Sequence, residues 1–337
     1  MKIAINGFGR IGRIFFRQAF DRADFNIRAL NDLGDVENLA YLLRYDSVYG
    51  RYDKNVKCQM SNVKCSLIVD NKEIPVFQEK DPVKLPWKDL NVDVVVESTG
   101  VFTSYEKAKA HLDAGAKRVV ITAPAKDEAT PTATPNVGID FLSQAPITSN
   151  ASCTTNATTP VAAIMMKNPG VQKAMLNTVH GYTATQSLVD GPGGKDFLRG
   201  RAAAVNIVPS STGAAEAVYR AIPSLKGLFD GIAMRVPVIS GSILDFTFLA
   251  KRKTSVEEIN DIFRNAAKSP EWQGILKVSE EPLVSTDVLG DPYGSIIDAS
   301  LTRVVDGDLV KVCAWYDNEW GYCAMLIKHL DQIAKLL

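Results

Sequence analysis

The sequence lacks a long hydrophobic run. No stretch approaches the ~18 consecutive apolar residues that a membrane-spanning helix needs. The N-terminal segment MKIAINGFGR reaches Arg10 before the apolar core of a secretory signal can form. We therefore expect neither a membrane segment nor a secretory signal.

Cysteine is scarce, and its spacing shows no pairing. The five cysteines, Cys58, Cys65, Cys153, Cys313 and Cys323, are an odd number and contain no C-x-x-C pair. This pattern argues against a disulfide framework and against a zinc site, and it favours free thiols in a reducing compartment. We expect a cytoplasmic protein without a metal site.

An excess of charge of either sign is also missing. Lys plus Arg and Asp plus Glu both number 38, so the formal net charge is 0 at pH 7. Without a basic excess or a basic strip that alternates with aromatics, neither nucleic acid nor an anionic membrane is expected as the primary partner. The length of 337 residues exceeds what one hydrophobic core usually organises, so two domains are expected.

The N-terminal part alternates short apolar runs with helix-like segments. Strands are predicted at residues 2–6, 26–31, 92–99 and 118–122, and helices at residues 11–23 and 104–116. Strand–helix alternation with strands rich in Val and Ile predicts a parallel sheet that is covered on both faces.

The pattern changes after about residue 150. A helix is expected from near Ser152, with Pro160 either absorbed early or kinking it. Strand-like runs follow at residues 231–241, 242–250 and 308–316, and the scarcity of helices between them predicts antiparallel pairing. The Gly-rich segment 188–201 is expected to be irregular. The segment 319–337 reads as one helix whose apolar positions are Met325, Leu326, Leu330 and Ile333.

Gly7, Gly9 and Gly12 fit the pattern G-x-G-x-x-G between a predicted strand and a predicted helix. Asp32 follows 20 residues after Gly12, at the end of the next strand. In this context the pattern indicates a dinucleotide site, with a pyrophosphate at the helix N-terminus. Asp32 would bind the adenosine ribose hydroxyls and repel a 2′-phosphate, and Leu33 offers no positive charge, so NAD is favoured over NADP. The alternative for Asp32 is a simple turn residue.

These patterns predict an α/β protein of two domains. A Rossmann-type parallel sheet forms an NAD domain over residues 1–152, completed by the C-terminal helix 317–337. Residues 153–316 form an α+β catalytic domain with a mainly antiparallel sheet.

Cys153 lies in the polar run SNASCTTNA, unlike a structural cysteine among aliphatic residues. Near a helix start, the helix dipole and unpaired N–H groups would stabilise its thiolate. Of the three histidines, His111 and His329 are expected on solvated helix faces. His180 closes the helix-plus-strand unit that Cys153 opens, so the two can meet, although a lone strand histidine is often structural.

A Cys–His pair would form a thiolate–imidazolium nucleophile. Beside a nicotinamide, the thiolate can add to an aldehyde and give a hemithioacetal whose carbon can surrender hydride. The product is a thioester, which is an activated acyl group. The sequence therefore favours an aldehyde dehydrogenase.

With GFGRIGR, SNASCTTN, HGYT, PSSTGAA, AMRVP and WYDNEWGY in this order, the sequence closely resembles the glyceraldehyde-3-phosphate dehydrogenase family from Met1 to the C-terminal helix. The resemblance implies that Cys153 is the acylated nucleophile. His180 would activate the thiol and shuttle the proton of the hemithioacetal hydroxyl. The implied ligands of the substrate phosphate are Thr183 and Arg235, and those of the attacking inorganic phosphate are Ser152, Thr154, Thr212 and Gly213, with Arg199 nearby.

The resemblance further implies NAD contacts from Arg10 and Ile11, from Lys80 and Thr122, and from Asn318, which would orient the nicotinamide carboxamide. It implies a homotetramer in which the segment 182–206 lies near the NAD of a neighbouring subunit. Three positions depart from the family pattern. Ala157 replaces a frequent second cysteine, Lys80 replaces a frequent arginine, and the loop around residues 138–140 is shortened.

The leading hypothesis is conversion of D-glyceraldehyde 3-phosphate, NAD and phosphate to 1,3-bisphosphoglycerate and NADH, in glycolysis or gluconeogenesis. An erythrose-4-phosphate dehydrogenase would keep the same cysteine and histidine but hydrolyse the thioester. A semialdehyde dehydrogenase ranks lower, because the threonine-rich segments favour two phosphate pockets. A binding protein that retained the fold would be expected to lose Cys153 or His180, and both are present.

Overall fold

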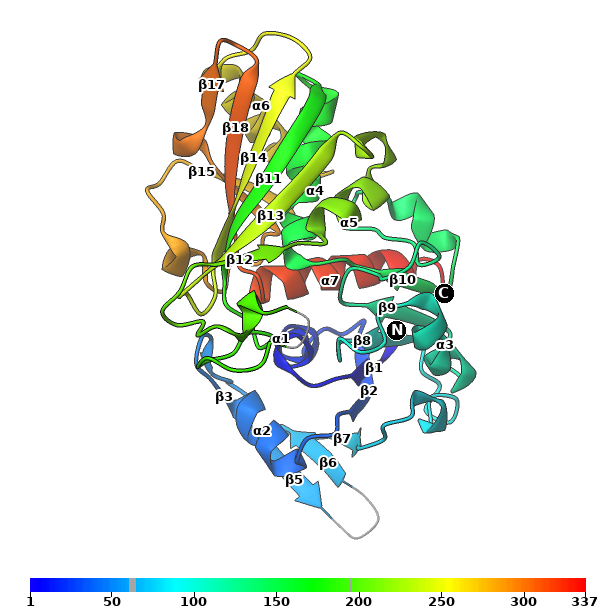
Figure 1. Cartoon of the computed structure of the whole chain (residues 1–337). Helices are drawn as coiled ribbons and strands as arrows, with labels where there is room; N and C mark the ends of the chain where they lie inside the picture. The colour runs from blue at the N-terminus through cyan, green and yellow to red at the C-terminus, as the bar shows by residue number, and fades with distance from the viewer. Residues whose placement is uncertain (61–64, 194–195) are drawn as a thin grey trace. The chain divides into compact units, whose positions relative to one another are not determined.

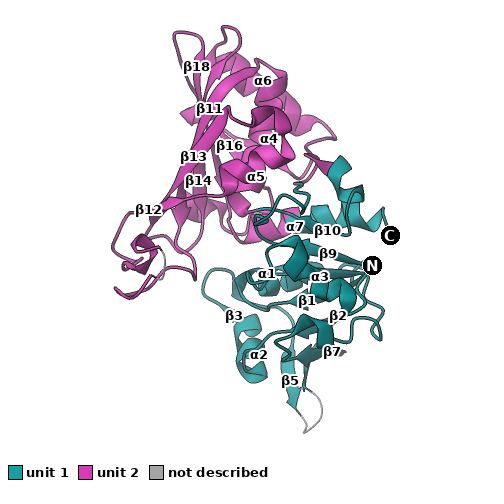
Figure 2. Ribbon diagram, turned by 45° about the vertical axis from the view of Figure 1, so that its right-hand side comes forward, with its two compact units in different colours: residues 1–133, 140–151, 326–337 teal, residues 134–139, 152–325 magenta. Residues whose placement is uncertain are grey.

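The computed structural model describes residues 1–60, 65–193 and 196–337. The chain divides into two compact units (Figure 2). Unit 1 comprises residues 1–133, 140–151 and 326–337, and unit 2 comprises residues 134–139 and 152–325. No helix in the described part of the chain is long and apolar enough to cross a membrane.

Unit 1 contains a sheet of eight strands in the order β10-β9-β8-β1-β2-β7-β6-β5 (Figure 1). From β10 to β7 every neighbouring pair is parallel, and the last two pairs are antiparallel. The strands are β1 (Lys2–Asn6), β2 (Asn26–Asn31), β5 (Val56–Met60), β6 (Cys65–Val69), β7 (Lys72–Phe77), β8 (Val94–Glu97), β9 (Arg118–Ile121) and β10 (Ile147–Ser149). The short strands β3 (Tyr45–Asp46) and β4 (Gly50–Arg51) pair separately. The predicted parallel sheet is confirmed.

Strand β1 lies between β2 and β8, so the chain order reverses at the β1/β8 boundary. The carboxyl ends of strands at such a switch point are the usual place for a ligand in an open α/β sheet. Asn6 and Glu97, the last residues of β1 and β8, are paired in register there.

The helices of this unit are α1 (Arg10–Ala19), α2 (Val36–Arg44) and α3 (Tyr105–Asp113). Helix α3 ends earlier than the predicted 104–116, because Gly115 has a φ of +103° and packs against the backbone of Lys88. The helix predicted at residues 11–23 likewise ends at Ala19.

The prediction of solvated faces for His111 and His329 is wrong, because both side chains are almost fully buried. The ring of His111 packs against those of Trp87 and Phe102 and bonds to Glu97. The ring nitrogens of His329 lie 3.2 Å from Thr148 Oγ1 and 3.2 Å from Asn150 Nδ2. The charged sequence neighbours lie on other faces of these helices, and the polar partners of each imidazole offset the cost of burying it.

Unit 2 contains a second sheet of eight strands, in the order β12-β13-β11-β14-β18-β16-β15 with β17 beside β18. The strands are β11 (Val171–Gly181), β12 (Val208–Ser211), β13 (Phe229–Val236), β14 (Ser242–Ala250), β15 (Leu276–Ser279), β16 (Ser295–Asp298), β17 (Arg303–Val305) and β18 (Leu309–Tyr316). The sheet is mainly antiparallel, as predicted, with two parallel pairs, β11–β13 and β15–β16. A crossover that contains a helix separates β11 from β13, which permits the parallel pairing.

Helices α4 (Cys153–Lys167), α5 (Ala214–Ala221) and α6 (Val256–Lys268) lie along one face of this sheet (Figure 2). Helix α4 runs through Pro160 to Lys167. Strand β14 alternates between buried and half-buried residues, and its buried set, which includes Phe246 and Phe248, joins the core beneath the helices. Helix α7 (Trp320–Ala334) ends the chain, and its predicted apolar positions are fully buried.

Candidate active site

The side chains of Cys153 and His180 meet in unit 2. Cys153 is the first residue of α4, and His180 is next to last in β11. Cys153 Sγ lies 3.3 Å from His180 Nε2. Ser152 is the N-cap of α4, where its hydroxyl accepts a hydrogen bond from the Thr155 N–H at 3.1 Å. The cap defines the first turn of the helix and thereby places the thiol at the helix N-terminus.

Tyr316 connects the helix and the strand that carry this pair. The sequence analysis assigned it no role. Its hydroxyl bonds to Thr154 Oγ1 at 2.9 Å and to Thr178 Oγ1 at 2.7 Å, so it links α4 to β11. The ring edge faces His180, with centroids 6.0 Å apart. A sequence signal did exist, because Tyr316 ends an apolar strand inside the WYDNEWGY motif.

Arg235 lies on the other side of the imidazole. The register of β11 and β13 places it beside His180, and its Nη1 lies 2.7 Å from His180 Nδ1. The carbonyl of Gly181 lies 2.6 Å from the same Nδ1 and 3.1 Å from Nη1. The guanidinium can only donate, so its contact with Nδ1 is a hydrogen bond only when Nδ1 carries no proton; when Nδ1–H donates to the Gly181 carbonyl, Nε2 is an acceptor that faces the thiol. This tautomer is the one that a base for Cys153 needs.

Burial acts against the charged form of each of these two groups taken alone. Burial raises the pKa of the Cys153 thiol, although Arg235 and hydrogen bonds from Thr154 oppose the rise. Burial, and then the charge of Arg235, lowers the pKa of His180 to about 3. These shifts apply to each group on its own, whereas a thiolate and an imidazolium 3.3 Å apart would stabilise each other, so the thiolate–imidazolium pair stays a prediction. The geometry suits His180 to take the thiol proton.

The residues expected to bind phosphate surround the same end of the sheet. Val208, the first residue of β12, pairs with Arg235. Arg199 bonds to Ser210 in β12 at 2.9 Å and to Asp196 at 3.0 Å. Burial lowers the pKa of Arg235, and the charge of Arg199 lowers it further, so the two guanidinium groups interact.

Two more expected phosphate ligands lie at the N-terminus of α5. Gly213 is the N-cap residue, and Thr212 Oγ1 accepts from the Ala214 N–H at 3.1 Å. Thr183 follows β11 and bonds to Thr185 through its hydroxyl at 3.0 Å. Residues 194–195 of the irregular segment 188–201 lie outside the described residues. The described part of that segment contains a single short 3₁₀ turn at Leu198–Gly200.

Asn318 is held in one orientation. Its Oδ1 accepts from the Gly241 N–H at 3.1 Å and from Ser242 Oγ at 2.8 Å. The hydroxyl of Ser242 in turn accepts from the Gly181 N–H at 3.2 Å. Because a backbone N–H can only donate, the amide oxygen of Asn318 must face Gly241 and Ser242. Its NH₂ group therefore points away from these two residues.

The glycine motif forms the turn between β1 and α1 in unit 1. Gly7 has a φ of +93°, and a Cβ on it would lie 2.6 Å from the Thr99 backbone nitrogen. A Cβ on Gly12 would lie 2.1 Å from the Gly7 carbonyl oxygen. A Cβ on Gly9 would meet nothing within 4 Å, and the first turn of α1 holds no acidic residue. An open backbone surface at a helix N-terminus fits a pyrophosphate.

The carboxylate of Asp32 follows β2. It accepts from the Phe8 N–H at 2.6 Å and from the Gly34 N–H at 2.8 Å, so it also holds the glycine turn. Among the other expected NAD contacts, Arg10 and Ile11 open α1, and Arg10 pairs with Asp46. Thr122 follows β9 and bonds to the Glu97 carbonyl at 3.1 Å, and Lys80 is exposed in the loop after β7.

Two family models match the chain. The model described as glyceraldehyde 3-phosphate dehydrogenase, NAD binding domain, matches residues 1–105, and the model described as glyceraldehyde 3-phosphate dehydrogenase, C-terminal domain, matches residues 152–318.

Curated relatives match almost the whole length. The chain is 47% identical over 332 residues to glyceraldehyde-3-phosphate dehydrogenase 1 of Streptomyces avermitilis, covering 97% of this chain and 96% of the relative. It is 45% identical over 341 residues to the glyceraldehyde-3-phosphate dehydrogenase of Borreliella burgdorferi, covering 99% and 100%. It is 44% identical over 340 residues to that of Zymomonas mobilis, covering 100% and 99%.

Proposed function

The chain belongs to the glyceraldehyde-3-phosphate dehydrogenase family, and we propose that Cys153, His180 and Arg235 form its reaction centre. The activity is the NAD-dependent, phosphorylating oxidation of glyceraldehyde 3-phosphate to 1,3-bisphosphoglycerate. The observation that carries the proposal is the 3.3 Å approach of Cys153 Sγ to a buried imidazole nitrogen. A nucleophile within reach of a base that a third group orients is the usual arrangement for covalent catalysis.

In the first step, His180 Nε2 accepts the thiol proton as Cys153 Sγ bonds to the aldehyde carbon. His180 then returns this proton to the oxyanion of the adduct, which becomes the hydroxyl of the hemithioacetal, and takes it again when the hydride leaves in the oxidation. The N–H groups at the start of α4 stabilise the oxyanion that precedes this hydroxyl. NAD, when bound, supplies the hydride acceptor. Cys153 then carries the acyl group as a thioester.

Phosphate releases the product. An oxygen of inorganic phosphate bonds to the thioester carbon, the C–S bond breaks, and His180 returns to the thiolate of Cys153 the proton that it took in the oxidation. Ser152, Thr154, Thr212 and Gly213 with Arg199 would hold this phosphate, and Thr183 with Arg235 would hold the phosphate of the substrate. Arg235 suits that role because its planar fork binds two phosphate oxygens at once.

NAD would be held in unit 1 by the turn over residues 7–12 and by Asp32. The open backbone at Gly9 fits the pyrophosphate, and the fixed carboxylate of Asp32 fits a pair of ribose hydroxyls. Lys80, Thr122 and Asn318 would complete the cofactor contacts. The fixed amide of Asn318 offers donors for a carboxamide oxygen.

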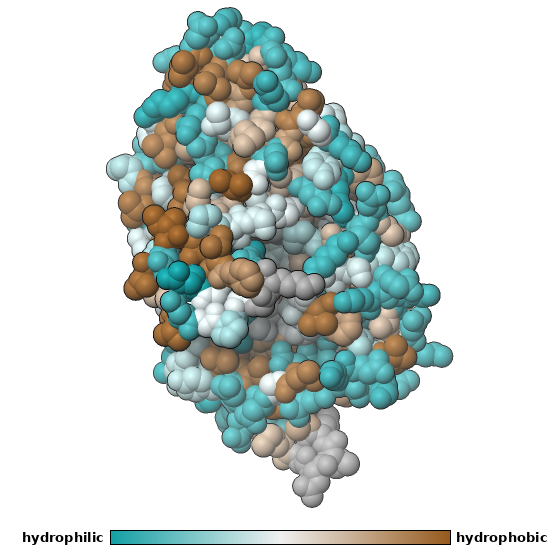
Figure 3. Space-filling view, in the orientation of Figure 1, coloured by the Kyte–Doolittle hydropathy of each residue, from teal (hydrophilic) through white to brown (hydrophobic). Residues whose placement is uncertain are grey.

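A homotetramer in the cytoplasm is the proposed state. Figure 3 shows hydrophobic side chains gathered on the left of the view, at the level of β12. Exposed apolar residues of the segment 182–207 are Leu188, Val189, Phe197, Leu198, Val205 and Ile207. Such a gathering is typical of a protein interface. All five cysteines are free, which fits a reducing compartment. Light scattering coupled to gel filtration would measure the oligomeric state.

The deciding experiment follows NADH formation from glyceraldehyde 3-phosphate and NAD, with phosphate present and then omitted. Turnover that requires phosphate is the expected result. Turnover that is indifferent to phosphate would mean that water releases the acyl group, and would favour an erythrose-4-phosphate dehydrogenase. Parallel rates on erythrose 4-phosphate would separate the two aldehydes.

A further inference from the structure

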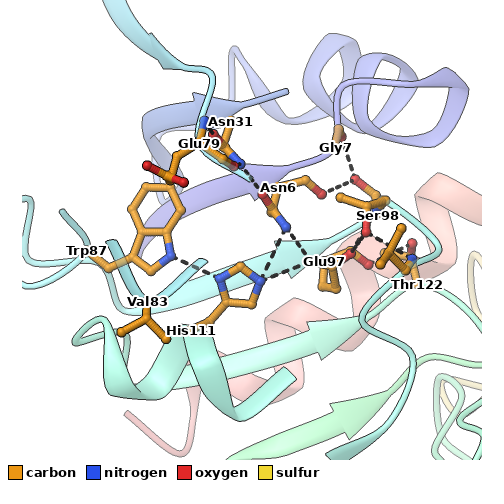
Figure 4. A network of polar contacts seen from close by, with 12 residues as sticks. Asn6, Gly7, Asn31, Glu79, Val83, Trp87, Glu97, Ser98, His111 and Thr122 are labelled. Carbon is orange, nitrogen blue, oxygen red and sulfur yellow. Dashed lines mark hydrogen bonds and ion pairs between the residues drawn. The ribbon is translucent and has the colours of Figure 1, made fainter. Parts of the chain in front are cut away.

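A buried polar network lies at the carboxyl ends of β1, β2 and β8, apart from the groups used above for chemistry (Figure 4). Its centre is the carboxylate of Glu97, which is 2% exposed. Glu97 Oε2 accepts from Asn6 Nδ2 and lies 3.0 Å from Nε2 of the fully buried His111. The indole N–H of Trp87 reaches the other nitrogen of His111 at 3.1 Å.

Two groups that can only donate a hydrogen bond determine the tautomer of His111 and the orientation of the Asn31 and Asn6 amides. The indole of Trp87 can only donate, so His111 Nδ1 is an acceptor and Nε2 carries the proton toward Glu97. The Asn6 NH₂ group 3.3 Å from Nε2 then donates to Glu97 and not to His111. The backbone N–H of Glu79 donates to Asn31 Oδ1 at 2.9 Å, which leaves Asn31 Nδ2 to donate to Asn6 Oδ1 at 2.7 Å. The amide of Asn6 therefore directs its NH₂ group at Glu97.

The carboxylate of Glu97 is saturated by these donors. Besides Asn6 and His111, the backbone N–H and the hydroxyl of Thr99 donate to Oε1. Four donors match the acceptor capacity of an ionised carboxylate. A buried charge of this kind is tolerated only while its hydrogen bonds are complete, so the loss of one donor disturbs the others.

Each end of the network continues into a residue expected to contact NAD. Asn6 precedes Gly7, Asn31 precedes Asp32, and Glu79 precedes Lys80. The carbonyl of Glu97 accepts from Thr122 Oγ1. The hydroxyl of Ser98 donates to the Gly7 carbonyl at 2.6 Å. The segments at Asn6, Asn31 and Glu79 are thus linked to the Glu97 carboxylate, and Thr122 is linked to the backbone of the same residue.

We propose that the Asn6–Glu97–His111 network is a positioning device that holds these four segments in the geometry that NAD binds. The inference rests on the proposed NAD site. A network that pre-orders the loops removes an ordering cost from cofactor binding. His111 and Glu97 act through the loops, and they are positioning residues in this sense.

The test is titration calorimetry of the full-length enzyme with NAD, well below the unfolding temperature. His111→Phe removes the donor to Glu97 and leaves the indole N–H of Trp87 without its acceptor. We expect its NAD dissociation constant to rise about tenfold, because roughly one charge-assisted hydrogen bond is lost and the loops must be ordered on binding. His111→Gln offers an amide donor and acceptor in the same region and is expected to restore much of the affinity. The KM for NAD should follow these changes, with kcat at saturating NAD within about twofold of wild type.

His329→Gln is the matched control, since it alters a second buried histidine of unit 1 whose partners, Thr148 and Asn150, lie outside the network. It should lower the thermal unfolding temperature and leave NAD affinity unchanged. If His111→Phe also lowers the unfolding temperature without weakening NAD binding, the network is merely structural and the proposal is wrong.

A milder variant covers the case in which His111→Phe does not fold. Ser98 follows β8, and Ser98→Ala removes only its hydroxyl, which donates to the Gly7 carbonyl at 2.6 Å and lies 3.1 Å from the Asn6 carbonyl. It should weaken NAD severalfold, and unchanged affinity would contradict the positioning role. The wild-type titration separates this inference from the proposed site. If wild-type protein does not bind NAD, the proposed function fails; if all variants bind as wild type does, only the network's role fails.

Discussion

The guanidinium of Arg235 lies against the ring of His180, with Nη1 2.7 Å from Nδ1, opposite the nitrogen that faces Cys153. A fixed positive charge at this distance opposes protonation of the imidazole, and burial acts in the same direction. Both effects favour the neutral imidazole, which is the form that can accept a proton. A substrate phosphate bound to Arg235 would offset its charge and stabilise the imidazolium that forms during attack.

Replacing the nucleophile should abolish turnover. In Cys153→Ser, the hydroxyl is a far weaker nucleophile than the thiol and would give an ordinary ester instead of a thioester. NAD binding, measured by calorimetry, should be nearly unchanged because Cys153 lies outside the unit that holds the glycine motif. Cys313→Ser is the matched control and should retain activity. Near-normal turnover of Cys153→Ser would refute the assignment.

Loss of the base should slow the reaction without stopping it. His180→Asn removes the proton acceptor at Nε2, and turnover should fall by roughly 10²–10⁴-fold, the usual scale for general acid–base catalysis. The KM for glyceraldehyde 3-phosphate should change much less than kcat in steady-state assays. Turnover close to that of wild type would show that another group takes the proton.

The reactivity of the thiol should report its raised pKa. Burial raises the pKa of Cys153 above the ordinary 9.0, so the thiolate forms only as the pH rises through and beyond that value. Alkylation of the NAD-free protein by iodoacetamide should accordingly keep accelerating past pH 9.0, later than in the urea-denatured chain. A rate that is already maximal at acidic pH would instead reveal a preformed thiolate–imidazolium pair.

Cofactor preference should depend on the charge of Asp32. Asp32→Gly removes the repulsion of a 2′-phosphate, and the ratio of kcat/KM for NAD over NADP should fall by about tenfold or more. Since the carboxylate also accepts from the N–H groups of Phe8 and Gly34, the variant should bind NAD more weakly too. Asp32→Asn is the sharper variant because it retains an acceptor while losing the charge. An unchanged cofactor ratio in both variants would count against the ribose role.

Buried histidine should make the fold acid-sensitive. The folded state lowers the pKa of His329 from 6.5 to about 4, chiefly by burial. Between these two values the unfolded chain binds a proton that the folded chain does not, so the free energy of unfolding falls as pH falls through this window. In His329→Gln the slope of that free energy against pH should be smaller by up to about 1.4 kcal/mol per pH unit. Urea unfolding across the window measures it, and identical slopes would contradict the prediction.

Local patterns in the sequence determined the type of each sheet. Runs of Val and Ile between helical segments predicted the parallel sheet of unit 1, and the strand-rich second half predicted the mainly antiparallel sheet of unit 2. The spacing of Gly7, Gly9 and Gly12 predicted the turn before α1, because each glycine answers a local backbone requirement. The helix-plus-strand unit between Cys153 and His180 was enough to suggest that they meet.

Only the tertiary structure decided what surrounds these groups. The sequence predicted that His111 and His329 lie at the surface. Charged neighbours on a helix do not show which polar groups from distant segments will contact a histidine between them. Tyr316 and Arg235 reach His180 through strand pairings between distant segments, which no local pattern encodes. The resting protonation of Cys153 and His180 likewise depends on burial, which exists only once the chain has folded.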